Sequence, residues 1–171
     1  MAKLEICLVR HADALDADGR LVTSDAQRPL SGDGQLQARL LGKALAAYGW
    51  HPDLLLHSPL VRTTQTANFM LEGAKKLSMH WKSEPFAPLA SGAGIRMVLS
   101  GLEKANHKGK LVLVGHMPEV SELAGWFLGA DPANLHFPKA GAMLISCPLG
   151  LAEGMASLKW FTDSAWHELA D

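Results

Sequence analysis

Cysteine is scarce in this chain of 171 residues, which contains only Cys7 and Cys147. Each thiol lies inside an apolar stretch, which excludes a disulfide framework and favours buried cysteines in a reducing compartment. Neither sign of charge dominates, because 16 Lys and Arg are balanced by 17 Asp and Glu. No global field therefore draws the chain to nucleic acid or to an anionic membrane, and any bound anion needs a local cluster of cations.

Long apolar runs are also missing. Residues 4–9 are interrupted by Glu5 and end at Arg10, too short for a signal peptide, and no run approaches the roughly 18 apolar residues of a membrane span. The histidines form no His-x-x-x-His pair, no glycine-rich nucleotide motif is present, and Ala14 cannot serve as the first ligand of a calcium loop. We therefore expect a cytoplasmic protein that uses no metal and no cofactor.

Length and an apolar share of 48% predict one globular domain spanning residues 1–171. Short apolar runs predict buried strands at residues 4–9, 53–56 and 110–114, with a shorter strand at 79–83. Helical periodicity predicts helices at residues 36–48, 60–71, 95–102 and 120–127. An antiparallel pair of edge strands is predicted at residues 142–147 and 157–161. This order indicates a single-domain three-layer α/β/α fold, whose sheet is mostly parallel with an antiparallel edge.

Three predicted strands end in side chains that can bind an anion. Arg10 and His11 end the first, Ser58 and Arg62 follow the second, and His116 follows the strand at 110–114. Ligands of open α/β sheets bind beyond the carboxyl ends of the strands. A single arginine there is usually a solvated charge, and a single histidine a loop residue. Their recurrence at three strand ends instead predicts a site for an anion, most plausibly phosphate.

Two helices are predicted to begin beside these strand ends. Ser58 is expected to cap the helix that follows it, with Pro59 at its first position and Arg62 in or next to its first turn. The helix after His116 is expected to carry Pro118 in its first turn. Both helix N-termini then add positive potential to the anion site.

Three segments carry a resemblance to a known family. The segment Leu8-Val9-Arg10-His11-Ala12 resembles the Arg-His-Gly signature of the histidine phosphatase superfamily, the phosphoglycerate mutase-like enzymes. Residues 58–67 resemble the second motif of that family, and Val114-Gly115-His116 resembles the third. Order and spacing agree over nearly the whole chain. Residues 25–34 and the short length are similar to the SixA-type phosphohistidine phosphatases of this superfamily.

The resemblance implies that His11 is the nucleophile and that Arg10, Arg62 and His116 bind the transferring phosphoryl group. Chemistry agrees, since a neutral imidazole can attack phosphorus while cationic donors stabilise the equatorial oxygens. Water then hydrolyses the phosphohistidine of the enzyme. Arg28 is expected either to add a contact to the phosphoryl group or to form a surface pair with Asp25.

The sequence offers two candidates for a general acid, which would protonate the leaving group. Related enzymes take a carboxylic acid from the region after the third strand, where Glu84 is the only carboxylate between residues 75 and 102. Glu84 is either that acid or the polar end of the short strand, and Asp13 is a reserve candidate. Ala12 replaces the usual glycine, which would strain the backbone if this position required a positive φ.

A site without an obvious acid suits a substrate with a good leaving group. Imidazole, whose conjugate acid has a pKa of about 6.5, needs less protonation help than an alkoxide. The chain is also too short for the lid insertion of the longer mutases, which leaves the site open to a protein surface. We therefore expect a phosphorylated protein as partner, such as a histidine-containing phosphotransfer domain. The alternatives are a phosphatase of small phosphate esters and a non-catalytic phosphate-recognition module.

Overall fold

A six-stranded sheet in the order β3-β2-β4-β1-β5-β6 forms the centre of the computed structural model, which describes residues 3–20 and 22–167. The strands are β1 (Leu4–Arg10), β2 (Leu54–His57), β3 (Ser83–Pro85), β4 (Lys110–Gly115), β5 (Ala142–Cys147) and β6 (Ser157–Thr162). Strands β3, β2, β4 and β1 are parallel, whereas β5 is antiparallel to β1 and to β6. The mostly parallel sheet with an antiparallel edge is confirmed.

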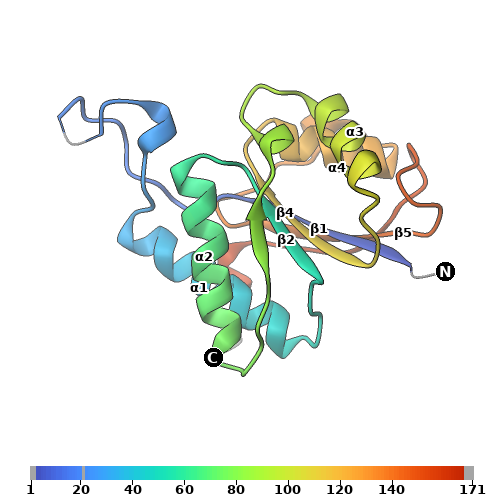
Figure 1. Cartoon of the computed structure of the whole chain (residues 1–171), viewed down its shortest axis with the longest axis horizontal. Helices are drawn as coiled ribbons and strands as arrows, with labels where there is room; N and C mark the ends of the chain where they lie inside the picture. Colours follow the sequence, from blue (N-terminus) through green and yellow to red (C-terminus); the bar gives the residue numbers. More distant parts are fainter. Residues whose placement is uncertain (1–2, 21, 168–171) are drawn as a thin grey trace.

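Helices cover both faces of this sheet, as Figure 1 shows. The helices are α1 (Gly32–Ala47), α2 (Val61–Lys75), α3 (Ile95–Ala105), α4 (Glu119–Leu128) and the short α5 (Ser164–His167), with the 3₁₀ turns η1 (Asp25–Gln27), η2 (Ala87–Leu89) and η3 (Pro132–Asn134). Helices α1, α2 and α5 lie against one face, while α3 and α4 lie against the other. The single-domain α/β/α architecture is therefore confirmed.

The two apolar layers follow from the alternation of side chains along the strands. On β1, Ile6 and Leu8 pack against α3 and α4, whereas Cys7 and Val9 pack against α1 and α2. Both faces of the strand are thus buried, which explains why the central strands are apolar without interruption. Cys7 and Cys147 are buried free thiols, as predicted.

Helices α1 and α2 approach each other through glycine. A Cβ atom on Gly42 would lie 2.0 Å from the carbonyl oxygen of Met70, and one on Gly73 would lie 1.9 Å from that of Arg39. Real Cβ atoms do not come this close, so the two helix backbones are in direct contact. This contact fixes where the N-terminus of α2 lies.

The predicted position of the third strand was wrong. The third strand is not at residues 79–83 but at Ser83–Pro85, where Glu84 pairs in register with Leu56 of β2. The strand is short because Pro85 has no N–H to donate and the chain turns into η2.

Among the described residues, no helix is long and apolar enough to cross a membrane.

Candidate active site

The carboxyl ends of β1, β4 and β2 lie side by side. Strand β1 pairs with β4 as far as Gly115, and β2 pairs with β4 as far as Val114. Just beyond the strands, the ring centroids of His11 and His116 are 5.5 Å apart. The sheet therefore brings two imidazoles from segments more than a hundred residues apart to one rim.

His11 presents an uncharged imidazole with a defined tautomer. Its Nδ1 lies 2.7 Å from the carbonyl oxygen of Ala12, which can only accept, so Nδ1 carries the proton and Nε2 keeps its lone pair. Burial lowers the pKa of His11 to about 3, opposed by this hydrogen bond and reinforced by the charges of His116, Arg62 and Lys139. At neutral pH the ring is therefore uncharged, which is the protonation state that a nucleophilic imidazole requires.

Ser58 orients His116 and does not cap a helix. The Ser58 hydroxyl lies 2.8 Å from Nε2 of His116, and the N-cap of α2 is Leu60, which has extended backbone angles. The predicted cap was wrong because the backbone is still extended at Leu60, so the helix begins only at Val61. Burial lowers the pKa of His116 to about 4, with the charge of Arg62 lowering it further. Because Ser58 Oγ already accepts from the N–H of Leu60 at 3.4 Å, we assign its own proton to the hydrogen bond with Nε2, which places the proton of the neutral His116 ring on Nδ1.

Arg62 lies in the first turn of α2, as predicted, and the residue is only 5% exposed. Its guanidinium donates to the Asp25 carbonyl at 2.7 Å and to Asp25 Oδ2 at 3.0 Å. The charge of Arg62 acts on both His11 and His116. Helix α2 is also tied to the first strand, because the N–H of Ala12 donates to Thr66 Oγ1.

Arg10 is held by the turn that precedes β5. Its Nη1 donates to the carbonyl oxygen of Phe137 at 2.7 Å. Three buried nitrogens of this group have no hydrogen-bond partner among the described residues, namely Nε of Arg10, Nε of Arg62 and Nδ1 of His116. Buried donors without partners are rare, and a bound ion or a catalytic role is one explanation for three of them in one place. Phosphoryl oxygens have the charge and the acceptor capacity that these three donors need.

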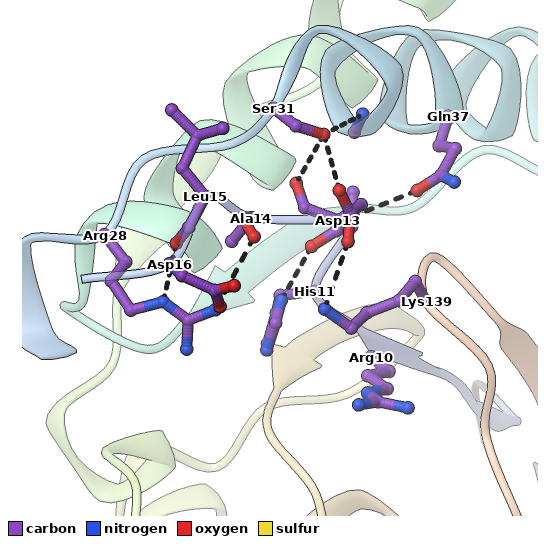
Figure 2. Close-up of polar contacts among 12 residues, drawn as sticks. Arg10, His11, Asp13, Ala14, Leu15, Asp16, Arg28, Ser31, Gln37 and Lys139 are labelled. Atoms are coloured by element: carbon purple, nitrogen blue, oxygen red, sulfur yellow. Dashed lines mark hydrogen bonds and ion pairs between the residues drawn. The ribbon is translucent and has the colours of Figure 1, made fainter. Parts of the chain in front are cut away.

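Asp13 lies next to His11 but is held by other groups, as Figure 2 shows. Its carboxylate accepts from Ser31 Oγ at 2.7 Å and from Lys139 Nζ at 3.3 Å, and its backbone N–H donates to Gln37. The hydrogen bond from Ser31 is the main reason that the pKa of Asp13 is lowered. A carboxylate stabilised in this way holds no proton to give at neutral pH.

Arg28 contacts the loop before α1, and Glu84 lies on the edge strand of the sheet. Arg28 donates to the carbonyl oxygen of Leu15 at 2.7 Å and pairs with Asp16 and Asp25, so it supports the loop that carries Asp25 to Arg62. The pair with Asp25 is one of the two roles predicted for it. Glu84 is exposed on the edge strand β3.

The backbone at Ala12 does not have a positive φ, so alanine is tolerated where the family usually has glycine. The glycine that this segment requires is Gly34 of α1, because a Cβ there would lie 1.9 Å from the carbonyl oxygen of Asp13. In the described part of the chain, no three His, Cys, Asp or Glu side chains group closely enough to hold a metal ion.

Comparison with known proteins decides the family. The family model of the histidine phosphatase superfamily (branch 1) matches residues 6–85. An uncharacterized protein of Picosynechococcus sp. is 33% identical over 164 residues, which cover 94% of this chain and 92% of the relative. The chain belongs to the histidine phosphatase superfamily.

Two solved structures of this superfamily show the same fold. The protein histidine phosphatase SixA complexed with tungstate has a TM-score of 0.78 at 21% identity and covers 94% of this chain and 97% of its own. The mycobacterial glucosyl-3-phosphoglycerate phosphatase has a TM-score of 0.66 at 16% identity, covering 95% and 100%. Membership of the superfamily supports phosphatase activity, while the two matched structures, at 21% and 16% identity, show the shared fold.

The buried histidines of this histidine phosphatase predict an acid-sensitive fold. Burial lowers the pKa of His11 to about 3 and those of His116 and His167 to about 4, whereas an unfolded histidine titrates near pH 6.5. The unfolded chain therefore binds more protons between these values. Stability is complete above about pH 6.5 and falls below it, by about 1.4 kcal/mol per pH unit for each fully shifted histidine.

Urea unfolding at pH 7.5, 6.0 and 5.0 measures this loss. His167 lies outside the site, and His167→Gln is expected to remove its contribution to this pH-dependent loss of stability. The exposed His80→Gln is the matched control. A free energy of unfolding that is constant from pH 7.5 to 5.0 would contradict the neutral state of these rings.

Proposed function

We propose that this chain is a phosphohistidine phosphatase that acts on a phosphorylated protein through a covalent intermediate on His11. The observation that carries the proposal is the neutral His11 ring beside three buried donors without partners, on Arg10, Arg62 and His116. Nε2 of His11 attacks phosphorus and the bond from phosphorus to the leaving nitrogen breaks. The three donors stabilise the charge on the equatorial oxygens.

Hydrolysis completes the cycle. Water attacks the phosphohistidine of the enzyme, the bond between Nε2 and phosphorus breaks, and inorganic phosphate leaves. The chemistry uses the side chains named above and no metal, so activity is expected to persist in the presence of a chelator.

The carboxylates near the site favour a nitrogen leaving group over an alkoxide. Asp13 is held ionised by Ser31 and Lys139, and Asp25 is held ionised by Arg28 and Arg62. Glu84 is exposed on an edge strand. An alkyl ester requires general acid help, which is worth roughly 10²–10⁴-fold, whereas imidazole leaves without it more readily.

Small-ester hydrolysis is the second candidate function, because the fold matches a glucosyl-3-phosphoglycerate phosphatase as well as SixA. Comparing a phosphohistidine protein, phosphoramidate and an alkyl phosphate in chelator-containing buffer separates the two. We expect the highest kcat/KM for the phosphohistidine protein.

Glu84→Gln is expected to leave all these rates within about twofold of the wild type, since the proposed nitrogen leaving group needs little protonation help from a carboxylic acid. The exposed Glu103→Gln on α3 is the matched control. A wild type that prefers the alkyl ester, together with a selective loss of roughly 10²–10⁴-fold in Glu84→Gln, would instead assign Glu84 as the acid of a small-ester phosphatase.

A further inference from the structure

The turn before β5, residues 137–141, is fastened to the nucleophile on both sides of Lys139. The carbonyl oxygen of Phe137 accepts from Arg10, and the N–H of Ala140 donates to the carbonyl oxygen of His11 at 3.2 Å. The carbonyl oxygen of Gly141 accepts from the N–H of Arg10 at 3.1 Å. Three hydrogen bonds thus fix the backbone of Lys139 relative to Arg10 and His11.

The turn holds an unfavourable backbone conformation. Ala140 is fully buried and has a φ of 55°, in the left-handed region that residues with a Cβ avoid. A Cβ on Gly141 would lie 2.7 Å from Cδ of Pro138, so the turn has no room for a larger residue there. Such conformations persist where surrounding structure enforces them, and they cluster at functional sites.

The ammonium group of Lys139 lies beside His11 and is paired with Asp13. Its Nζ lies 3.3 Å from Asp13 Oδ1, and its charge contributes to the lowered pKa of His11. Figure 2 shows its side chain running beside His11 to reach Asp13. An ammonium group has three donors, and Asp13 is its one hydrogen-bond acceptor among the residues that the structure describes. Two donors of Lys139 are therefore available to a ligand.

We propose that Lys139 binds the phosphoryl group of the substrate as a third cation beside Arg10 and Arg62. The proposal rests on the proposed function, because it assigns a further ligand to the phosphoryl group that His11 attacks. A phosphoryl group brings two negative charges, and Asp25 already neutralises part of the charge of Arg62. Lys139 adds further N–H donors for the phosphoryl oxygens, and its flexible stem lets it follow the phosphorus as the bonds change.

Tungstate binding by calorimetry and kcat/KM on a phosphohistidine protein test the proposal in four variants. Lys139→Met is expected to weaken both by roughly 10- to 100-fold, the usual cost of losing a hydrogen bond to a charged group. Lys139→Arg keeps the charge and retains most of the tungstate affinity. The exposed Lys159→Met on β6 is the matched control and behaves as wild type.

Asp13→Asn separates binding from a merely structural role. It breaks the ion pair but keeps an acceptor for Ser31, so tungstate affinity is expected to stay within about threefold of the wild type. A Lys139→Met variant that binds tungstate like the wild type would overturn the proposal. So would an Asp13→Asn variant with the same loss as Lys139→Met, because the pair would then only support the turn. The trapping of phosphate on His11 is measured in a separate experiment on the wild type. A result against the covalent mechanism can therefore be distinguished from a result against the proposed role of Lys139.

Discussion

His11→Ala is expected to lose turnover by several orders of magnitude while the chain remains folded. The ring supplies the nucleophilic Nε2, which no neighbouring group replaces, since Nε2 of His116 is engaged by Ser58. The fold survives because His11 follows the last residue of β1 and contributes no side chain to the apolar layers. Circular dichroism and kcat/KM on a phosphohistidine protein measure the two effects.

The covalent step has its own readout. Rapid acid-free quenching of the wild type with labelled substrate is expected to trap phosphate in an acid-labile, base-stable bond at His11. The exposed His80→Ala serves as the control, with normal turnover and normal labelling. Activity within tenfold of the wild type in His11→Ala would exclude the mechanism.

Arg62→Met is expected to lower kcat/KM by roughly 10²–10³-fold, the cost of removing one preorganised donor from a developing charge. The apolar stem of methionine fills much of the same buried space, so the loss reports charge and hydrogen bonding more than packing. Arg62→Lys is expected to recover only part of the activity, because an ammonium group is a point charge without the planar fork of arginine.

Competitive inhibition by tungstate distinguishes binding from folding in these variants. The inhibition constant is expected to rise in Arg62→Met and to stay unchanged in Arg96→Met, which removes an exposed arginine from α3. An Arg62→Met enzyme with the wild-type inhibition constant would show that Arg62 serves only to hold Asp25.

The periodicity of the sequence predicted the long helices and the central strands because burial on both faces leaves an uninterrupted apolar signal. The convergence of strand ends was predictable for the same reason, since parallel neighbours place Arg10 and His116 at one edge. Short elements could not be predicted from periodicity. Strand β3 has only three residues, with no periodicity of its own, and its position depends on its pairing with β2.

The contacts around the imidazoles were not predictable, because they depend on turns and not on strand order. Lys139 reaches Asp13 through a turn whose left-handed residue is alanine, where glycine or asparagine would have been the signal. Asp25 reaches Arg62 from a loop with no periodic pattern. Ser58 has the sequence context of a helix cap, and only the extended backbone at Leu60 turns it toward His116.

Gly42 and Gly73 restrict how sequences of this kind can diverge at positions far from the chemistry. A methyl group at either position would meet backbone atoms of the facing helix, which cannot rotate aside as a side chain can. The helices would separate, and α2 would move Arg62 and Thr66 away from His11. A relative with alanine at either position could therefore retain every signature residue and still have a site of the wrong shape.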